Sequence, residues 1–490
     1  MKTAISTHHE ISLIKILFLI ILFILGICSC YNDRIGFIFS LVEVLAVLSC
    51  VVSGKLGLAI ILHNIFLGCS TESSFFVFGD NVKIINCYAF MPIVHRYGPL
   101  FVELLLYVSV RAWKPKSMGV LPPKSKLSLF VRYTTIIVIG GFVTSAFSLL
   151  LNDNNVLNLT WFFDSYLTES VYWLIYLLDI LILYEYLNRS DGFDGILRSW
   201  LINFFVAMVI SSYISILSGV RGYYSIYDNI IVMPFVIFYG ALLIIFPSFK
   251  SFKESKYLYA LGVLSIVSLI LAPTPLMGKW ILLLLYSVVL FIFLHLNKSN
   301  IISAIVATII ISFVFYGVIA KTEISDILLY KYDQAISLFT IFSAAGADDA
   351  ASSPFARFDE LYNIYLEYVD KPYYMLIGKG IGGSTHQWVA LTNWADGSSF
   401  TDTQVSAGIF TEMHESLNIV FLKFGLCGLF WFFWVLYTVV INIKKSPWLS
   451  MGLIWFLFFI NNYISMYIMI PVLLLGLYEL DINKLNTNKA

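Results

Sequence analysis

The sequence predicts an all-α, polytopic transmembrane helical bundle of about fourteen helices with one long hydrophilic loop. Of the 490 residues, 59% are hydrophobic and 12% are charged, whereas soluble proteins carry about 25% charged residues. Apolar runs long enough to cross a bilayer, about 20 residues each, recur along the chain. The only long hydrophilic stretch lies between Lys321 and Glu412. The net charge is zero and no basic patch is interleaved with aromatic residues, so we expect no nucleic-acid partner.

Each predicted helix corresponds to one apolar run. The first run, Ile11 to Cys28, lacks a clear cleavage site and is followed at once by another run, so we interpret it as a retained span. The last two helices can alternatively be one bent helix around Asn461. The fourteen helices are predicted to begin near Ile11, Ile35, Leu56, Tyr97, Leu127, Val171, Trp200, Ile230, Tyr257, Trp280, Ile301, His414, Ser450 and Ser465.

The distribution of lysine and arginine predicts the orientation, because cytoplasmic loops of membrane proteins are enriched in both. With fourteen helices and the N-terminus inside, all the basic loops fall on the cytoplasmic side. The long loop then faces the periplasm of a bacterial inner membrane. The basic residues that carry this argument are Arg111, Lys114, Lys116, Lys124, Lys126, Lys250, Lys253, Lys256, Lys444 and Lys445.

Three parts of the chain follow from this topology. Residues 1–320 hold eleven helices, residues 321–412 form the periplasmic loop, and residues 413–490 return to the membrane. Within the loop, Ser353 and Pro354 predict a helix start. Phe358, Leu361, Tyr365 and Tyr368 then recur at helical spacing, and the helix must end before Pro372. We expect this amphipathic helix to lie on the membrane face of the protein.

A glycine-rich segment follows the amphipathic helix. Gly380 and Gly382, with Gly378 and Gly383 beside them, permit a tight turn or a close approach of the backbone to a ligand. We therefore expect Gly380 and Gly382 to contribute to substrate binding.

Four side chains are predicted to share one membrane level on the periplasmic side. They are Arg221, Lys279, Arg357 and His414. Three cations and one titratable base suit a substrate that carries a phosphate or pyrophosphate at headgroup level. The imidazole of His414 can take a proton from an attacking hydroxyl. We therefore predict His414, Arg221 and Arg357 as catalytic residues, with Lys279 and Glu415 in substrate binding.

Each of these residues also has a simpler interpretation. Arg221 and Lys279 can anchor ordinary lipid headgroups, and Arg357 can pair with Asp359 or Glu360 at a helix start, which stabilises little at a surface. His386 is interpreted as a loop residue. His8, His9, His63, His95 and His295 have no comparable company in the sequence. Glu43 and Lys423, deeper in predicted helices, are interpreted as members of ion pairs inside the bundle.

Four elements of the sequence resemble the O-antigen polymerase and O-antigen ligase superfamily of bacterial inner membranes. His414-Glu415, followed after nine residues by Gly425-Leu-Cys-Gly428, is similar to the family's histidine motif. The segment ARFDELYNIYLEYVDKPYYMLIGKGIGG resembles its periplasmic pattern of an arginine, a helix, a proline and a glycine-rich turn. Arg221 in GVRGYYSIYDN resembles the arginine before a central helix, and Lys279 stands where many members have arginine. Glu415 departs from the family's usual small or amide residue.

The resemblance implies a GT-C-like, metal-independent and inverting glycosyltransferase without a cofactor. Its substrate would be an undecaprenyl-diphosphate-linked oligosaccharide in the membrane lipid, and a chain-length regulator and a flippase would be partners. The expected reaction joins the growing glycan to the next lipid-linked repeat unit. His414 would deprotonate or orient the acceptor hydroxyl, while Arg221 and Arg357 would hold the diphosphate.

Other functions remain open at this point. An O-antigen ligase, which transfers the glycan to lipid A core, would share the same site. A polysaccharide flippase or other transporter is disfavoured because no repeat relates the two halves of the sequence. A cell-wall glycan polymerase would rely on an aspartate, for which the candidates are Asp333, Asp348, Asp349 and Asp359.

Overall fold

The computed structural model describes residues 33–69, 94–113, 124–151, 166–189, 353–389, 400, 402–411, 413, 416–446, 448–449, 452–453 and 473–482. These residues are mostly helical, as the sequence predicts. Three of their helical stretches are long and apolar enough to cross a membrane: Lys126–Leu150, Glu169–Arg189 and Ser416–Asn442. The chain therefore has the character of a membrane protein.

Six of the predicted helices fall within the described residues, and all six begin within three residues of the predicted start. The other eight predicted helices begin outside the described residues, so the count of fourteen stays a prediction, as do the boundaries at residues 320 and 412. The six helices are α2 (Asp33–Val52), α3 (Leu56–Cys69), α5 (Val94–Ala112), α6 (Lys126–Leu150), α8 (Thr168–Arg189) and α19 (Ser416–Asn442).

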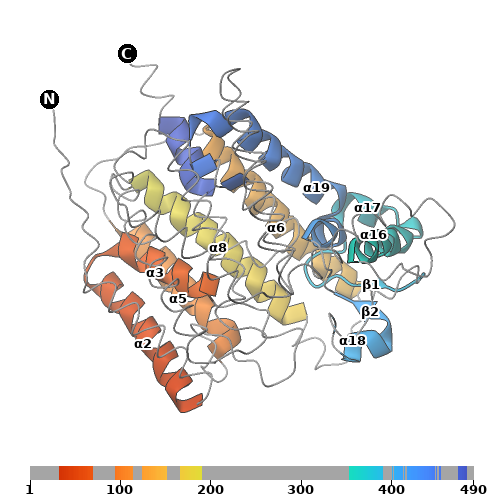
Figure 1. Ribbon diagram of the computed structural model, residues 1–490, viewed down its shortest axis with the longest axis horizontal. Helices are drawn as coiled ribbons and strands as arrows, with labels where there is room; N and C mark the ends of the chain where they lie inside the picture. The colour runs from red at the N-terminus through yellow and green to blue at the C-terminus, as the bar shows by residue number, and fades with distance from the viewer. Residues whose placement is uncertain are drawn as a thin grey trace, which may run out of the picture.

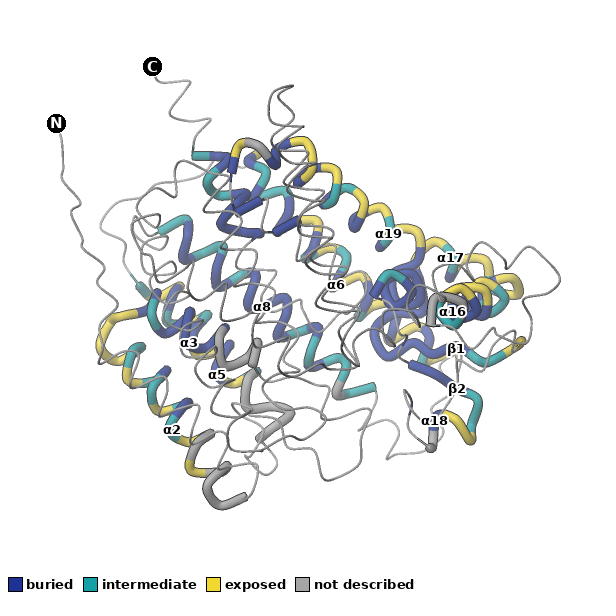
Figure 2. The backbone as a smooth tube through the Cα atoms, viewed as in Figure 1, coloured by how far each residue is buried: buried dark blue, intermediate teal, exposed yellow. Residues whose placement is uncertain are grey.

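The long helices α6 and α19 expose apolar side chains on their outer faces. Ile136 and Val143 on α6 are more than half exposed, as are Phe430 and Tyr437 on α19. Figure 2 shows these exposed faces in yellow along both helices. A soluble protein rarely exposes so large a contiguous apolar surface, whereas lipid chains would cover it at no cost.

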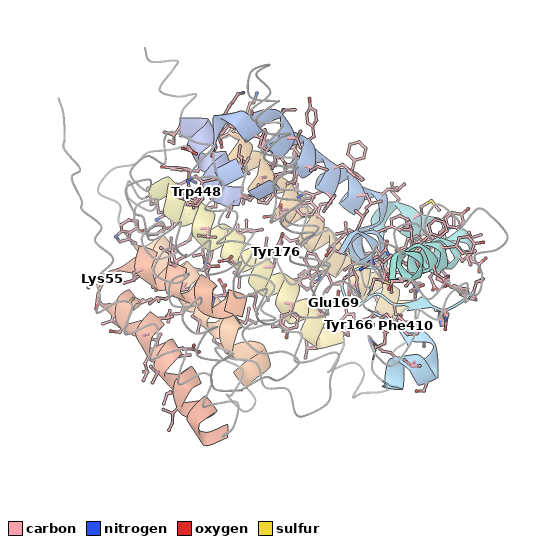
Figure 3. The ribbon with its side chains drawn as sticks, in the orientation of Figure 1. Lys55, Tyr166, Glu169, Tyr176, Phe410 and Trp448 are labelled. Carbon is pink, nitrogen blue, oxygen red and sulfur yellow. The ribbon has the colours of Figure 1, made fainter. Side chains whose placement is uncertain are left out.

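Helices α5 and α8 end, and α6 begins, at the same end of the bundle. Arg111 at the end of α5 pairs with Glu185 near the end of α8, with Nη2 and Oε1 3.1 Å apart. The hydroxyls of Ser128, near the start of α6, and Tyr184 of α8 are 3.0 Å apart. The predicted basic side of the molecule is thus one end of the bundle. Lys55 and Trp448 lie toward this end, away from Glu169 and Phe410 at the other (Figure 3).

The opposite end of the bundle carries a small folded unit, which we call the cap: the described residues between 353 and 413 (Figure 1). The cap contains α16 (Ser353–Val369), α17 (Tyr373–Ile377) and α18 (Asp402–Ala407), with a two-stranded antiparallel sheet of β1 (Thr385–His386) and β2 (Ile409–Phe410). α16 has the start predicted from Ser353 and ends before Pro372, as expected.

A hydrophobic core joins the cap to α19. It contains residues from α16, α17 and β2, together with residues of α19 and of the segment just before it. Since these residues come from both parts, the cap and the first turns of α19 are one packed unit. The buried members are Ile364, Tyr368, Tyr374, Phe400, Phe410, Met413, Ile419, Phe421 and Leu422.

Candidate active site

Helix α19 is interrupted at Gly425, whose φ of 59° and ψ of −150° are not helical. A break in a helix disturbs the hydrogen bonds of the neighbouring turns, and the affected carbonyls need new donors. Here the carbonyls of Phe421 and Leu422 accept from the Tyr368 hydroxyl at 3.0 and 2.8 Å. Burial raises the pKa of Tyr368 well above its ordinary value, so this phenol stays protonated and can donate. A side chain of the cap thereby supplies the hydrogen-bond donor that the carbonyls near the break in α19 need.

Backbone amides of the glycine-rich turn of the cap also donate to carbonyls beside this break. The amide of Lys379 donates to the Leu422 carbonyl, and that of Gly380 donates to the Lys423 carbonyl, both at 2.9 Å. Gly380 has a φ of 79° and Gly382 the same value, a conformation that suits glycine. A Cβ on Gly380 would lie 2.2 Å from the amide nitrogen of Ser145 on α6. The predicted tight turn is present, and its close approach is to a membrane helix.

Small residues of α6 contact the glycine-rich turn on its other side, away from α19. The Ser145 hydroxyl donates to the Ile381 carbonyl at 2.5 Å, and the Ser148 hydroxyl donates to the Lys379 carbonyl at 2.8 Å. Small residues in membrane helices permit such close approach. Non-helical backbone at membrane depth is tolerated where protein buries it and satisfies its hydrogen bonds, and this turn meets both conditions. The substrate-binding role of Gly380 and Gly382 stays a prediction.

A buried ion pair locks the turn in place. The Lys423 ammonium lies 2.8 Å from Oε2 of Glu169, the residue that opens the α8 span. It also donates to the carbonyls of Gly383 and Thr411, at 2.7 and 2.8 Å. All three of its N–H donors therefore have acceptors. Glu169 accepts in addition from the Gly382 amide at 3.0 Å. The interpretation of Lys423 as a member of an interior ion pair is confirmed, and its partner is Glu169.

Arg357 lies beside the first turn of α19. Its carbonyl accepts from the side-chain amide of Asn418 at 2.9 Å, and the same amide donates to Glu360 Oε2 at 3.0 Å. Met413, just before the predicted catalytic histidine, is buried in the core that joins the cap to α19. The backbone of Arg357 and the side chain of Met413 thus belong to the same packed unit. His414, Glu415, Arg221 and Lys279 lie outside the described residues.

A second polar cluster surrounds Glu367 in the cap. The Lys379 ammonium, 1% exposed, lies 2.5 Å from Oε1 of Glu367. Oε2 is 3.1 Å from Nδ1 of His386 and accepts from the Trp388 indole at 2.7 Å. His386 is therefore part of β1 and of an ion cluster, and not the plain loop residue that the sequence suggested. Glu367 thereby orients the half-exposed Trp388 ring. This ring presents an aromatic face at the surface of the cap.

The charge of Glu367 should make the cap sensitive to acid. Burial by itself raises the pKa of this carboxyl, but the hydrogen bond to His386 and the nearby Lys379 ammonium outweigh burial and lower it from 4.5 to about 2. Because the pKa is lowered by folding, the carboxylate stabilises the protein above pH 4.5, and this contribution is lost as the pH falls toward 2. E367Q should lower the free energy of unfolding by about 2 kcal/mol at neutral pH.

The difference between wild type and E367Q should shrink toward zero as the pH falls, since a protonated Glu367 resembles glutamine. Thermal unfolding followed by tryptophan fluorescence across the acid range would measure this. E185Q, in the exposed ion pair at the other end of the bundle, is the control. A difference that stays constant with pH would contradict the ionised state of Glu367.

The structure also corrects the interpretation of His63, which seemed to have no company in the sequence. Nε2 of His63, on α3, lies 2.8 Å from Oε1 of Glu103 on α5. Asp179 of α8 is buried near the same pair. The signal in the sequence was the presence of three ionisable residues in three different apolar segments, which no local motif connects.

No family model, curated protein or solved structure matches this chain. The function must therefore be inferred from the sequence and from the geometry of the described residues. This geometry combines helices able to span a membrane, a cap fixed to three of them, and an arginine held at the start of α19.

Proposed function

We propose that the protein is a bacterial inner-membrane glycosyltransferase that polymerises undecaprenyl-diphosphate-linked O-antigen repeat units. The enzyme transfers the growing glycan to the next lipid-linked unit, with inversion at the anomeric carbon and without a metal ion. The proposal includes a GT-C-like bundle of about fourteen helices and an active site on the periplasmic side. It rests on the four elements of the sequence that resemble the polymerase and ligase superfamily.

One observation from the structure carries the most weight in its support. The cap is built onto three helices that are long enough to cross a membrane, and it holds Arg357 beside the first turn of α19. A lipid-linked substrate keeps its diphosphate at headgroup level, where this arginine can meet it. A guanidinium binds phosphate oxygens bidentately. The proposed partner of Arg357, His414, directly precedes this same turn in the sequence.

The proposed mechanism needs positioning and charge stabilisation more than strong chemistry, because diphosphate is already a good leaving group. His414 takes the proton of the acceptor hydroxyl as it attacks the anomeric carbon. Arg221 and Arg357 stabilise the negative charge that develops on the departing diphosphate. Lys279 and Glu415 are assigned to substrate binding, together with Gly380 and Gly382 of the turn.

Loss of His414 should abolish polymerisation while the protein still accumulates in the membrane. In a host strain deleted for the gene, plasmid-borne H414A should yield no long-chain lipopolysaccharide on a gel. R357K should lose about 10²-fold of the activity if the contact is bidentate. R111K is the matched control, since Arg111 pairs with Glu185 at the opposite end of the bundle. Normal long-chain product from H414A would remove His414 from the mechanism.

The same gel separates a polymerase from a ligase. A cell without a polymerase still caps lipid A core with a single repeat unit. A cell without a ligase shows bare core and stores glycan on undecaprenyl diphosphate. We expect the single-unit pattern, because Glu415 departs from the residue usual after the histidine. Bare core with stored polymer would instead identify a ligase.

A further inference from the structure

Helices α3, α5 and α8 bury three ionisable side chains between them. His63 is 1% exposed, Glu103 0% and Asp179 1%. Asp179 lies ten residues from both ends of the span Glu169–Arg189, which is about 15 Å from each end of the helix. It therefore sits near the middle of a membrane span. Ionisable groups at that depth are costly and usually functional.

The two carboxyl groups of this cluster are not equivalent. Glu103 has one oxygen, Oε1, 2.8 Å from His63 Nε2. Asp179 lies within electrostatic reach of both. By distance and angle neither of its oxygens has a hydrogen-bond partner in the described part of the chain, although the side-chain amide of Asn64 lies close enough to favour the ionised carboxylate. That amide donates to the Ile60 carbonyl at 3.1 Å. The Tyr176 hydroxyl, nearly one turn before Asp179, also lacks a partner among the described residues.

Charge balance then requires bound protons. With both carboxyls ionised and the imidazole neutral, the cluster would carry two negative charges in a setting of low dielectric constant, where an isolated charge costs many kcal/mol. Two bound protons make the cluster neutral. One can be shared along the His63–Glu103 contact, which accommodates either a neutral pair or an ion pair. The other belongs on Asp179, because its buried position near the middle of the span disfavours a charge there.

We propose that His63, Glu103 and Asp179 form a proton-binding site inside the membrane, with Asp179 as the carboxyl that holds the exchangeable proton. A proton fits this site better than a metal ion, since no group of three His, Cys, Asp or Glu side chains among the described residues is placed to hold a metal. The site is independent of the proposed glycosyl transfer. It lies on α8, whose first residues hold Lys423 and the glycine turn.

The charged groups around the site can be assigned helix by helix. α2 packs on α3 and contributes one buried carboxyl, Glu43. On α5 the flanking charges are Arg96 and Arg111. On α8 the nearest charge is Glu185, which pairs with Arg111 and Arg189 at the basic end of the bundle. Glu43 and Glu103 are therefore the described carboxyls of this region that the experiment must separate from Asp179.

Infrared spectroscopy of the full chain in lipid nanodiscs tests the proposal, because a protonated carboxylic acid has its own carbonyl stretch that shifts in heavy water. The wild type should show this band at neutral pH. D179N, which is nearly isosteric, should lose the part of the band that belongs to Asp179, while E103Q, E43Q and E185Q should keep that part. The wild-type spectrum needs no variant to fold, so absence of the band there would overturn the proposal by itself.

Two further outcomes would also reject it. A band of the same intensity in D179N as in the wild type would show that Asp179 holds no proton. A band whose titration moves when sodium replaces choline in the buffer would identify an alkali cation site instead. Circular dichroism of D179N checks that the helices are formed.

Discussion

Replacing Lys423 with methionine should destabilise the protein by about 3–5 kcal/mol, as is typical when one partner of a buried ion pair is removed. The ammonium is fully buried and satisfies three acceptors from three different segments: Glu169, Gly383 and Thr411. K423M leaves the Glu169 carboxylate without its counter-charge and two carbonyls without a donor. Because these contacts hold the glycine turn between α6 and α19, we expect the cap to detach before the helices separate.

A double-mutant cycle measures the coupling directly. E169Q alone leaves a buried ammonium without a counter-charge and should cost about as much as K423M. The double variant E169Q/K423M should be more stable than the sum of the two losses predicts. E185Q removes the partly exposed carboxylate that pairs with Arg111 and Arg189 on the solvent side of the same helix, and should cost only about 1 kcal/mol. Thermal unfolding midpoints of the purified variants would report all four. A K423M protein as stable as E185Q would contradict the anchoring role.

The helix starts were predictable from the sequence because they depend on local composition. Apolar runs, the Ser353–Pro354 start and the stop before Pro372 are short-range signals, and the structure reproduces them. The interior position of Lys423 was predictable for a similar reason, since a charge deep in an apolar run must be buried with a partner. That partner, Glu169, is 254 residues away in the sequence. No local pattern of residues indicates the pairing.

The same limit explains what the sequence missed. The spacing of Tyr368 placed it on one face with Phe358, Leu361 and Tyr365, yet Tyr368 is 0% exposed whereas Phe358 is 59% exposed. Its hydroxyl turns inward because the break at Gly425 offers carbonyls that need a donor. The clusters of Glu367 with His386, and of His63 with Glu103, join residues 19 and 40 positions apart. Only the packing of the helices brings them together.

Adding one methyl group at Gly380 should separate the cap from the helices. An alanine there must adopt a φ of 79°, which costs about 1–2 kcal/mol. Its Cβ would also lie 2.2 Å from the Ser145 nitrogen and 2.6 Å from the Gly141 carbonyl oxygen. Both obstacles are helix backbone and cannot rotate away. We therefore expect G380A to lose about 2–5 kcal/mol, the sum of the conformational cost and of overpacking.

Two matched comparisons isolate the effect of that close approach. Gly408 also has a positive φ, 64°, but a Cβ there meets nothing within 4 Å, so G408A should show the conformational cost alone. In α6, a Cβ on Gly140 meets nothing, whereas one on Gly141 would lie 2.4 Å from the Phe424 ring. Alanine is favoured over glycine in a helix by up to about 1 kcal/mol. G140A should therefore be neutral or stabilising and G141A destabilising, as thermal unfolding would show. If G380A and G408A lose equal stability, the turn is not packed against α6.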